Sequence, residues 1–190
     1  MNRRLTKQLT GLLILIALSL LGVGVSQTGD LTAPDLAEQI KPGYHKVVSI
    51  SDGDTFQVQI AGKRETIRMI GIDTPETRDP RKPVQCFGTT SSNKLKELLG
   101  GATVRLEGDP ASGDRDKYQR LLRWVYLEDG RFANQLMVQE GYAFAYTIFP
   151  NSKLEDFRGW EREAREANRG LWAGCSVNEA NDKRETTPAQ

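Results

Sequence analysis

The sequence predicts an α+β fold, a five-stranded β-barrel of the OB type with three α-helices. Short segments with the apolar and polar pattern of strands precede and follow one segment whose leucines have helical spacing. Two further helical segments come last, so the order is three strands, a helix, two strands and two helices. Five short strands in one domain favour a small closed barrel.

The first three strands are predicted before residue 73. Three apolar residues within 47–50 indicate the first strand. Residues 55–60 alternate between polar and apolar side chains, which predicts a strand with one buried face. A turn at Gly62 then leads into a third strand, which we expect to cover residues 63–72.

One helix and two strands follow. The leucines at 95, 98 and 99 indicate a helix that ends at the glycine pair 100–101. Apolar residues at 104–106 and 121–127 predict the fourth and fifth strands.

The last two helices complete the domain. The first is expected at about 132–140, with Gly141 as its stop. The second begins near Ser152, which with Glu155 has the spacing of a capping box.

Both ends of the chain differ from this central part. Residues 1–26 have a basic start, an apolar stretch and small residues near the end, which predicts a secretory signal peptide. The alternative is an uncleaved membrane anchor, although the apolar stretch is short for a spanning helix. Residues 27–42 are predicted to be a linker, 43–175 the folded domain and 176–190 a disordered tail.

Charge and cysteines add two constraints. Cleavage after the signal would change the formal net charge from +1 to −2, so an anionic polymer must be bound by a local site rather than by bulk charge. The two cysteines, Cys86 and Cys175, predict one disulfide if the chain is exported. The alternative is two free thiols.

Carboxylates gather in two candidate site segments. DGDT at 52–55 lies between two strands, and a simple turn would also explain it. In DTPE at 73–76 the proline biases Thr74 toward an extended backbone, so that its carbonyl and the flanking acids can point the same way. Such oxygens suit a hard divalent cation. The alternative for this segment is a solvated loop.

Basic residues form the other half of the pattern. Arg68 interrupts an apolar strand, and an arginine there needs an anion, either a phosphate or an internal carboxylate. DKYQR at 116–120 supplies a second guanidinium with a phenol beside it, although many such runs are only charged surface loops.

In this order, DGDT, IRMIGIDTPET and DKYQR resemble segments of the micrococcal (staphylococcal) nuclease family, the thermonucleases. The likeness extends from about residue 44 to 172 and includes GRFANQLMVQEGYA and NRGLW. The resemblance implies an OB-type barrel and a calcium-dependent phosphodiesterase. Members act on DNA and RNA, single- or double-stranded, and leave 3′-phosphates.

The resemblance also implies roles for individual residues. Asp54, Asp73 and the Thr74 carbonyl would bind Ca²⁺ directly, and Asp52 and Glu76 would contact it through water. Arg68 and Arg120 would hold the scissile phosphate, and Lys117 and Tyr118 would contact a phosphate of the substrate. Exported members also carry cysteines at the positions of Cys86 and Cys175.

The chemistry of phosphodiester hydrolysis agrees with these roles. The reaction needs a nucleophilic water and donors for the charge that develops on the phosphoryl oxygens. Two arginines supply bidentate donors, and Glu76 is the candidate base for the water. The one histidine, His45, precedes the first motif and is expected at the surface.

Two departures from the family pattern stand out. Gln119 replaces the glycine of DKYGR, and the segment YAFAYTIFP after Gly141 differs most. Core packing is therefore the favoured interpretation of Tyr142 and Tyr146, ahead of base stacking.

Two other functions compete with the enzyme. A catalytically weak nucleic-acid-binding barrel would be favoured by loss of an acid or an arginine, but these residues are present. A membrane-tethered interaction domain would leave the acids and arginines unexplained. We therefore expect an exported monomeric nuclease, secreted or periplasmic, with no evident protein partner; the alternative location is at the membrane.

Overall fold

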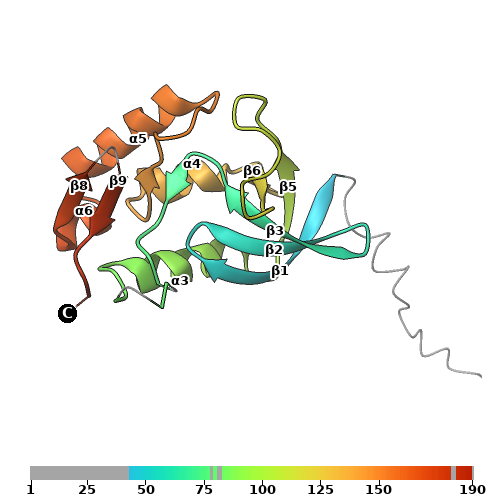
Figure 1. The fold of residues 1–190 in the computed structure, drawn as a ribbon, viewed down its shortest axis with the longest axis horizontal. Helices are drawn as coiled ribbons and strands as arrows, with labels where there is room; N and C mark the ends of the chain where they lie inside the picture. The colour runs from blue at the N-terminus through green and yellow to red at the C-terminus, as the bar shows by residue number, and fades with distance from the viewer. Residues whose placement is uncertain (1–42, 78, 81–82, 181–182, 190) are drawn as a thin grey trace, which may run out of the picture. The chain divides into compact units, whose positions relative to one another are not determined.

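The computed structural model describes residues 43–77, 79–80, 83–180 and 183–189 (Figure 1). The predicted signal segment 1–26 and linker 27–42 lie outside these ranges. Within them, no helix combines the length and apolar character needed to cross a membrane.

Five strands close into a barrel in the order β1-β2-β3-β6-β5, which confirms the predicted fold class. β3 pairs in parallel with β6, and the other four pairings are antiparallel. Alternate residues of β2 and β3, including Phe56, Val58 and Ile67, are fully buried inside. The strands are β1 (Tyr44–Asp52), β2 (Thr55–Ile60), β3 (Lys63–Met69), β5 (Thr103–Glu107) and β6 (Leu121–Leu127).

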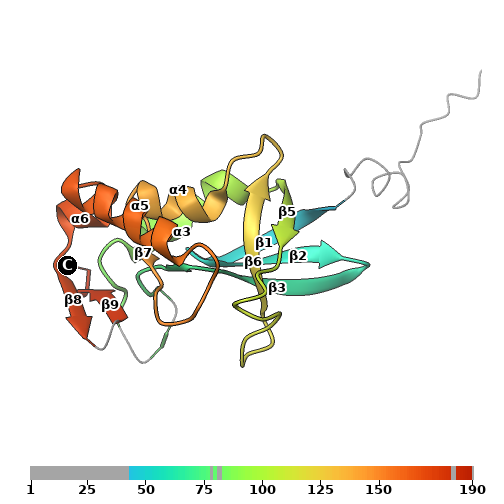
Figure 2. The ribbon, with the colours of Figure 1, turned by 90° about the horizontal axis from the view of Figure 1, so that it is seen from above.

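The three predicted helices are present and lie on one side of the barrel (Figure 2). They are α3 (Gly88–Leu99), α4 (Ala133–Gln139) and α5 (Leu154–Glu166), and a short α6 (Leu171–Gly174) follows. Aromatic rings join α5 to the barrel, since Phe157 stacks on Trp124 of β6 at 5.6 Å between ring centroids. These contacts extend the barrel core to the helices.

The third strand ends earlier than predicted. β3 stops at Met69, and the chain bends at Gly71 before the short strand β4 (Ile72–Asp73). Gly71 has φ +73°, and a Cβ there would lie 2.9 Å from the ring of Phe157. Only glycine fits such a bend without strain. β4 pairs with β7 (Phe144–Ala145) instead of extending the barrel.

The C-terminal segment is ordered, so the prediction of a disordered tail from residue 176 is wrong for its described part. β8 (Val177–Ala180) and β9 (Lys183–Thr186) form an antiparallel hairpin. The segment is polar, and its composition gives no sign of the three contacts that fix it to the domain. The anchors are a disulfide, backbone pairing with residues 84–86, and a buried ion pair.

The disulfide joins Cys86 to Cys175, the pairing that the sequence predicts, with Cα atoms 5.9 Å apart. The backbone N–H of Cys86 donates to the carbonyl of Thr187 at 2.7 Å, and the Thr186 hydroxyl donates to the carbonyl of Cys86 at 2.7 Å. Arg184 pairs with Glu161 of α5, and both side chains are largely buried. The hairpin is thus fixed to two separate parts of the domain.

The predicted capping box at the start of α5 does not form. Lys153 is the N-cap residue, and no side chain caps the helix. Ser152 instead donates its N–H and its hydroxyl to Asp109 Oδ2, at 2.6 and 2.9 Å. Asp109 is 3% exposed, and a buried carboxylate needs these donors more than the helix end does.

Candidate active site

Arg68 is the centre of the site and projects from β3. Its Nη1 donates to the carbonyls of Met69 and Ile72, at 2.8 and 2.7 Å. Its Nη2 contacts Asp54 Oδ2 at 3.2 Å and Asp73 Oδ1 at 2.9 Å. The early end of β3 makes this possible, because the bend at Gly71 brings Ile72 and Asp73 back alongside Arg68.

The first acidic motif packs against the second through Thr74. The N–H and the hydroxyl of Thr74 both donate to Asp54 Oδ2, at 3.2 Å. A Cβ at Gly53 would lie 2.8 Å from the Thr74 methyl group. Glycine between the two aspartates is therefore needed for close approach rather than for a special φ.

The acids of the site are crowded. Burial raises the pKa of Asp73 to about 6, an effect that Arg68 opposes and Asp54 reinforces. Burial also raises the pKa of Asp52 to about 6, and the nearby Asp54 adds to it. Burial is the main cause of both shifts, and repulsion from the neighbouring Asp54 adds to it.

Glu76 is held through its backbone. Its N–H donates to Gln85 Oε1 at 2.8 Å, and the Gln85 N–H donates back to the Glu76 carbonyl at 2.9 Å. Its carboxylate accepts the N–H of Asp79 at 3.1 Å. Glu76 lines the same cavity as the aspartates, so the structure brings it to the site.

Arg120 comes from the loop before β6. Asp116 holds it, accepting from Nε at 2.7 Å and contacting Nη2 at 2.6 Å. The same carboxylate accepts the N–H groups of Tyr118 and Arg120. Asp116 is thus a positioning residue that the sequence motif contained but that our prediction did not single out.

The loop needs an unusual backbone at one position. Gln119 has φ +65°, a conformation that favours glycine. Tyr118 is 67% exposed, and its ring lies 5.0 Å from Lys117 Nζ. Both predicted substrate contacts therefore face open solvent at the rim.

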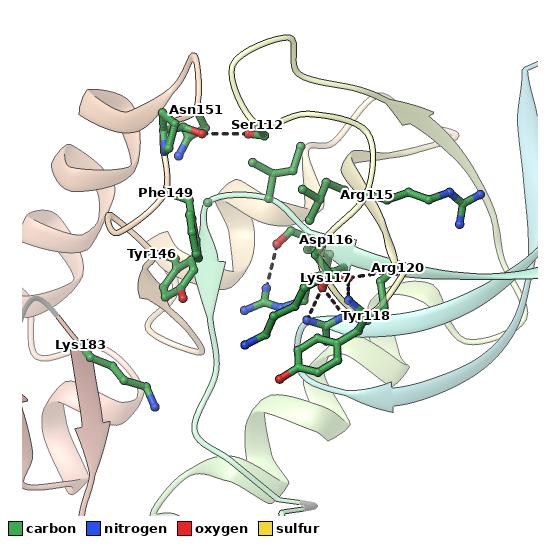
Figure 3. Close-up of a pocket in the computed structure, with 16 residues that line it drawn as sticks. Ser112, Arg115, Asp116, Lys117, Tyr118, Arg120, Tyr146, Phe149, Asn151 and Lys183 are labelled. Atoms are coloured by element: carbon green, nitrogen blue, oxygen red, sulfur yellow. Dashed lines mark hydrogen bonds and ion pairs between the residues drawn. The ribbon is translucent and has the colours of Figure 1, made fainter.

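Two adjoining cavities share Arg68 and Arg120. The polar cavity, of about 310 Å³, is lined by six carboxylates and four basic side chains. The wider cavity, of about 670 Å³, lies between the Lys117–Tyr118 loop and a wall formed by Tyr146 and Phe149 (Figure 3). Together they form a cleft with an acidic floor, basic edges and an aromatic wall.

Three residues of this cleft were missed or misjudged. Tyr146 was expected to pack in the core. It faces the cleft instead, with its ring 5.7 Å from the Arg68 guanidinium carbon. Phe149 is 62% exposed and lies 5.7 Å from Tyr146 between ring centroids. The departure of this segment from the family pattern was the available signal. Lys183 lines both cavities but belongs to the segment that the sequence predicts to be a disordered tail.

Two of the predicted Ca²⁺ ligands are carboxylates that contact the same arginine. Within the described ranges, no three His, Cys, Asp or Glu side chains converge as a set that could hold a metal ion. The predicted Ca²⁺ ligands include two carboxylates, Asp54 and Asp73, and both contact Nη2 of Arg68. The donor set is oxygen only, as calcium prefers.

Comparisons with known proteins agree with this architecture. Residues 66–174 match the family model described as staphylococcal nuclease homologue. The thermonuclease of Staphylococcus hyicus is 34% identical over 167 residues, which cover 86% of this chain and 96% of that protein.

Two Bacillus subtilis (strain 168) proteins match a shorter region. Endonuclease YncB is 42% identical and the SPbeta prophage-derived endonuclease YokF 41% identical, each over 125 residues or 64% of this chain. The chain covers 58% of the length of YncB and 41% of YokF. With the match to the family model and to nearly all of a thermonuclease, the chain belongs to the staphylococcal nuclease family.

Proposed function

We propose that this protein is an exported, calcium-dependent nuclease that hydrolyses phosphodiester bonds of DNA and RNA and leaves 3′-phosphate ends. The observation that carries the proposal is the convergence of Arg68 and Arg120, from β3 and from the loop before β6, on one acidic cavity. Thermonuclease and endonuclease relatives support the same reaction class.

The two arginines are the proposed donors to the scissile phosphate. Arg68 already uses Nη1 for two carbonyls and Nη2 for two carboxylates, so a phosphoryl oxygen would take Nε or replace a carboxylate at Nη2. Donors that are already in place strengthen most when charge develops in the transition state. The contacts of Arg68 to two backbone carbonyls leave its position independent of the substrate.

Calcium fits the acidic part of the cleft. Asp54, Asp73 and the Thr74 carbonyl would hold it, with Asp52 and Glu76 in contact through water. Asp52, Asp54 and Asp73 line one cavity, and a bound cation would reduce the repulsion between these neighbouring carboxylates. The chemistry that the bound ion supplies is neutralisation of charge on the phosphoryl oxygens.

Glu76 is the proposed base for the attacking water. It is the acid of the cleft whose backbone is clamped on both sides by Gln85, which fixes where its carboxylate can reach. Lys117 and Tyr118 would contact a neighbouring phosphate from the rim of the wider cavity.

Export is supported by the disulfide, since such bonds persist in oxidising compartments. We propose cleavage near Gln27 and release to the periplasm or the exterior, with retention at the membrane as the alternative. The intact mass of the exported protein, before and after reduction and alkylation, tests the cleavage point and the disulfide together.

The deciding experiment is degradation of single-stranded DNA and RNA with calcium, and with a chelator. Calcium should support cleavage, chelation should abolish it, and zinc should not restore it. The 3′ ends should resist polymerase extension until a phosphatase treats them. Full activity in chelator would contradict the metal assignment, and binding without cleavage would favour a nucleic-acid-binding module.

Variants of the acids test the assigned roles. Glu76→Gln should lower the cleavage rate on the order of a hundredfold without weakening substrate binding. Asp54→Asn should instead raise the calcium concentration needed for half-maximal activity.

A further inference from the structure

The C-terminal hairpin carries a cation into the cleft. Lys183 is the first described residue of β9, and its side chain lines both the polar cavity and the wider one. Figure 3 shows it extending from the hairpin into the space opposite Lys117 and Tyr118. The cleft therefore has basic groups on two opposing walls.

The charge of Lys183 reaches the centre of the site. Its side chain lines the same cavity as Arg68, Asp73 and Tyr146. Asp73 and Tyr146 in turn help to raise the pKa of Lys183, after its hydrogen bond to Glu185. Lys183 is thus electrostatically part of the site although it is far away in sequence.

The position of Lys183 is fixed rather than incidental. Arg184, the next residue, is buried against Glu161, whose carboxylate also accepts the N–H of Ala145 in β7 at 3.0 Å. β7 pairs with β4, which carries Asp73. The hairpin is therefore connected to β4, the strand that holds a proposed calcium ligand. The disulfide at Cys175, just before β8, also fixes the start of the hairpin to Cys86.

The ion pair between Lys183 and Glu185 leaves the Lys183 ammonium accessible to a phosphate. Its Nζ donates to Glu185 Oε1 at 2.7 Å, and the Lys183 side chain is 49% exposed. Exposed ion pairs of this kind are weak, so a phosphate can displace Glu185 from the Lys183 ammonium at little cost.

We propose that Lys183 is a substrate-binding residue that contacts a backbone phosphate beyond the scissile one, on the hairpin side of the cleft. The inference rests on the proposed nuclease function. It makes the hairpin a second binding wall, so that a strand lying in the cleft is held on both sides of the scissile phosphate, by Lys117 and Tyr118 on one side and by Lys183 on the other.

The test compares Lys183→Gln with Lys96→Gln, which removes the same charge from an exposed position on α3. Binding of a 12-residue single-stranded DNA is measured by fluorescence anisotropy over a range of salt concentrations. Lys183→Gln should weaken binding about 3- to 10-fold and reduce the salt slope by about 0.7, as for loss of one phosphate contact to a single strand. Lys183→Arg should restore binding, and Lys96→Gln should match the native protein.

A second arm uses substrate length. A dinucleotide with one phosphodiester has no further phosphate for Lys183, so Lys183→Gln should raise KM for the 12-mer and leave kcat/KM for the dinucleotide unchanged. Glu185→Gln should tighten 12-mer binding in the native protein but not in Lys183→Gln.

Each outcome has one meaning. Equal affinity and salt slope for Lys183→Gln and Lys96→Gln would overturn the inference, and so would an equal loss on the dinucleotide, which would place Lys183 at the scissile phosphate. Failure of the native protein to cleave either substrate would instead refute the proposed function, while the anisotropy measurement still decides the role of Lys183.

Discussion

The two proposed phosphate-binding arginines are positioned by different parts of the molecule. Arg68 belongs to a barrel strand, and two carbonyls and two carboxylates hold its guanidinium, which leaves the side chain 12% exposed. Arg120 belongs to a loop, depends mainly on Asp116, and is 29% exposed. The barrel wall therefore fixes one donor through many contacts, and the loop fixes the other through one carboxylate.

This difference suggests different consequences of mutation. A residue with many partners contributes to folding as well as to function, because its loss leaves several buried groups unpaired. A residue that is held by a single half-buried carboxylate leaves fewer groups unpaired when it is lost, so it contributes mainly to function. The predictions below test this contrast between the barrel wall and the loop.

The largest difference in stability is expected between the two arginine variants. Arg68→Ala leaves Asp54 and Asp73 without their shared cation, and loss of one partner of a buried pair typically costs about 3 kcal/mol. Arg120→Ala should cost less than about 1 kcal/mol. Urea denaturation without calcium measures both, with Arg131→Ala as the exposed control. Equal losses of unfolding free energy in Arg68→Ala and Arg120→Ala would contradict the contrast between the barrel wall and the loop.

A methyl group at Gly53 should disturb the barrel wall. Gly53→Ala places its Cβ 2.8 Å from the Thr74 methyl group and should destabilise the protein by about 1–3 kcal/mol. Cleavage should fall as Thr74 moves. Gly159→Ala is a control without a clash, since a Cβ there meets no atom within 4 Å, and its higher helix propensity in α5 should stabilise the protein by about 1 kcal/mol. Adding Thr74→Ser, which removes the crowded methyl group, should recover part of the stability.

Loss of the carboxylate that holds Arg120 should affect the loop. Asp116→Asn should reduce the cleavage rate on the order of tenfold, because a mispositioned donor stabilises the transition state less. Asp129→Asn removes a similar contact to Arg131 and should leave cleavage unchanged. An unchanged cleavage rate in Asp116→Asn would show that Arg120 does not need Asp116 to hold its guanidinium in place.

The same variant has a pH signature. Burial raises the pKa of Asp116, but hydrogen bonds from Arg120 outweigh it and lower the pKa overall. A lowered native pKa stabilises the fold above the unfolded pKa, and this contribution is lost as pH falls through the native value. The stability advantage of the native protein over Asp116→Asn should therefore shrink at acid pH. An advantage that grows toward low pH would contradict the assignment.

The smallest effect is expected at Gln119. A non-glycine residue at φ +65° costs about 1–2 kcal/mol, while glycine adds about 0.4–1 kcal/mol of unfolded-state entropy. Gln119→Gly should thus stabilise the protein by roughly 0.5–1 kcal/mol in thermal denaturation. Gln119→Ala keeps the strain and should give no such gain.

The sequence predicted what depends on local patterns. The barrel strands and the three helices follow from periodicity. The end of β3 at Met69 was missed because the constraint on Gly71 comes from Phe157, far away in the chain.

The parts of the cleft that were missed depend on long-range contacts. The C-terminal hairpin is polar and reads as disordered, because its anchors, the disulfide and the Arg184–Glu161 pair, join residues distant in sequence. Tyr146 enters the cleft because β7 pairs with β4, a pairing of two residues in each strand that no periodicity reveals. Local pattern therefore identified one wall of the cleft, and tertiary pairing supplied the other.

The most direct test of the central claim compares cleavage with binding in Arg68→Ala and Arg120→Ala. Single-turnover cleavage of a bound 12-residue DNA is measured with calcium, and equilibrium binding of the same DNA is measured beside it. Each variant should cleave on the order of a hundredfold more slowly or worse, with little change in affinity, because its guanidinium acts on charge that develops in the transition state. Weaker binding with an unchanged rate for bound substrate would make both arginines simple anchors and contradict the proposed active centre.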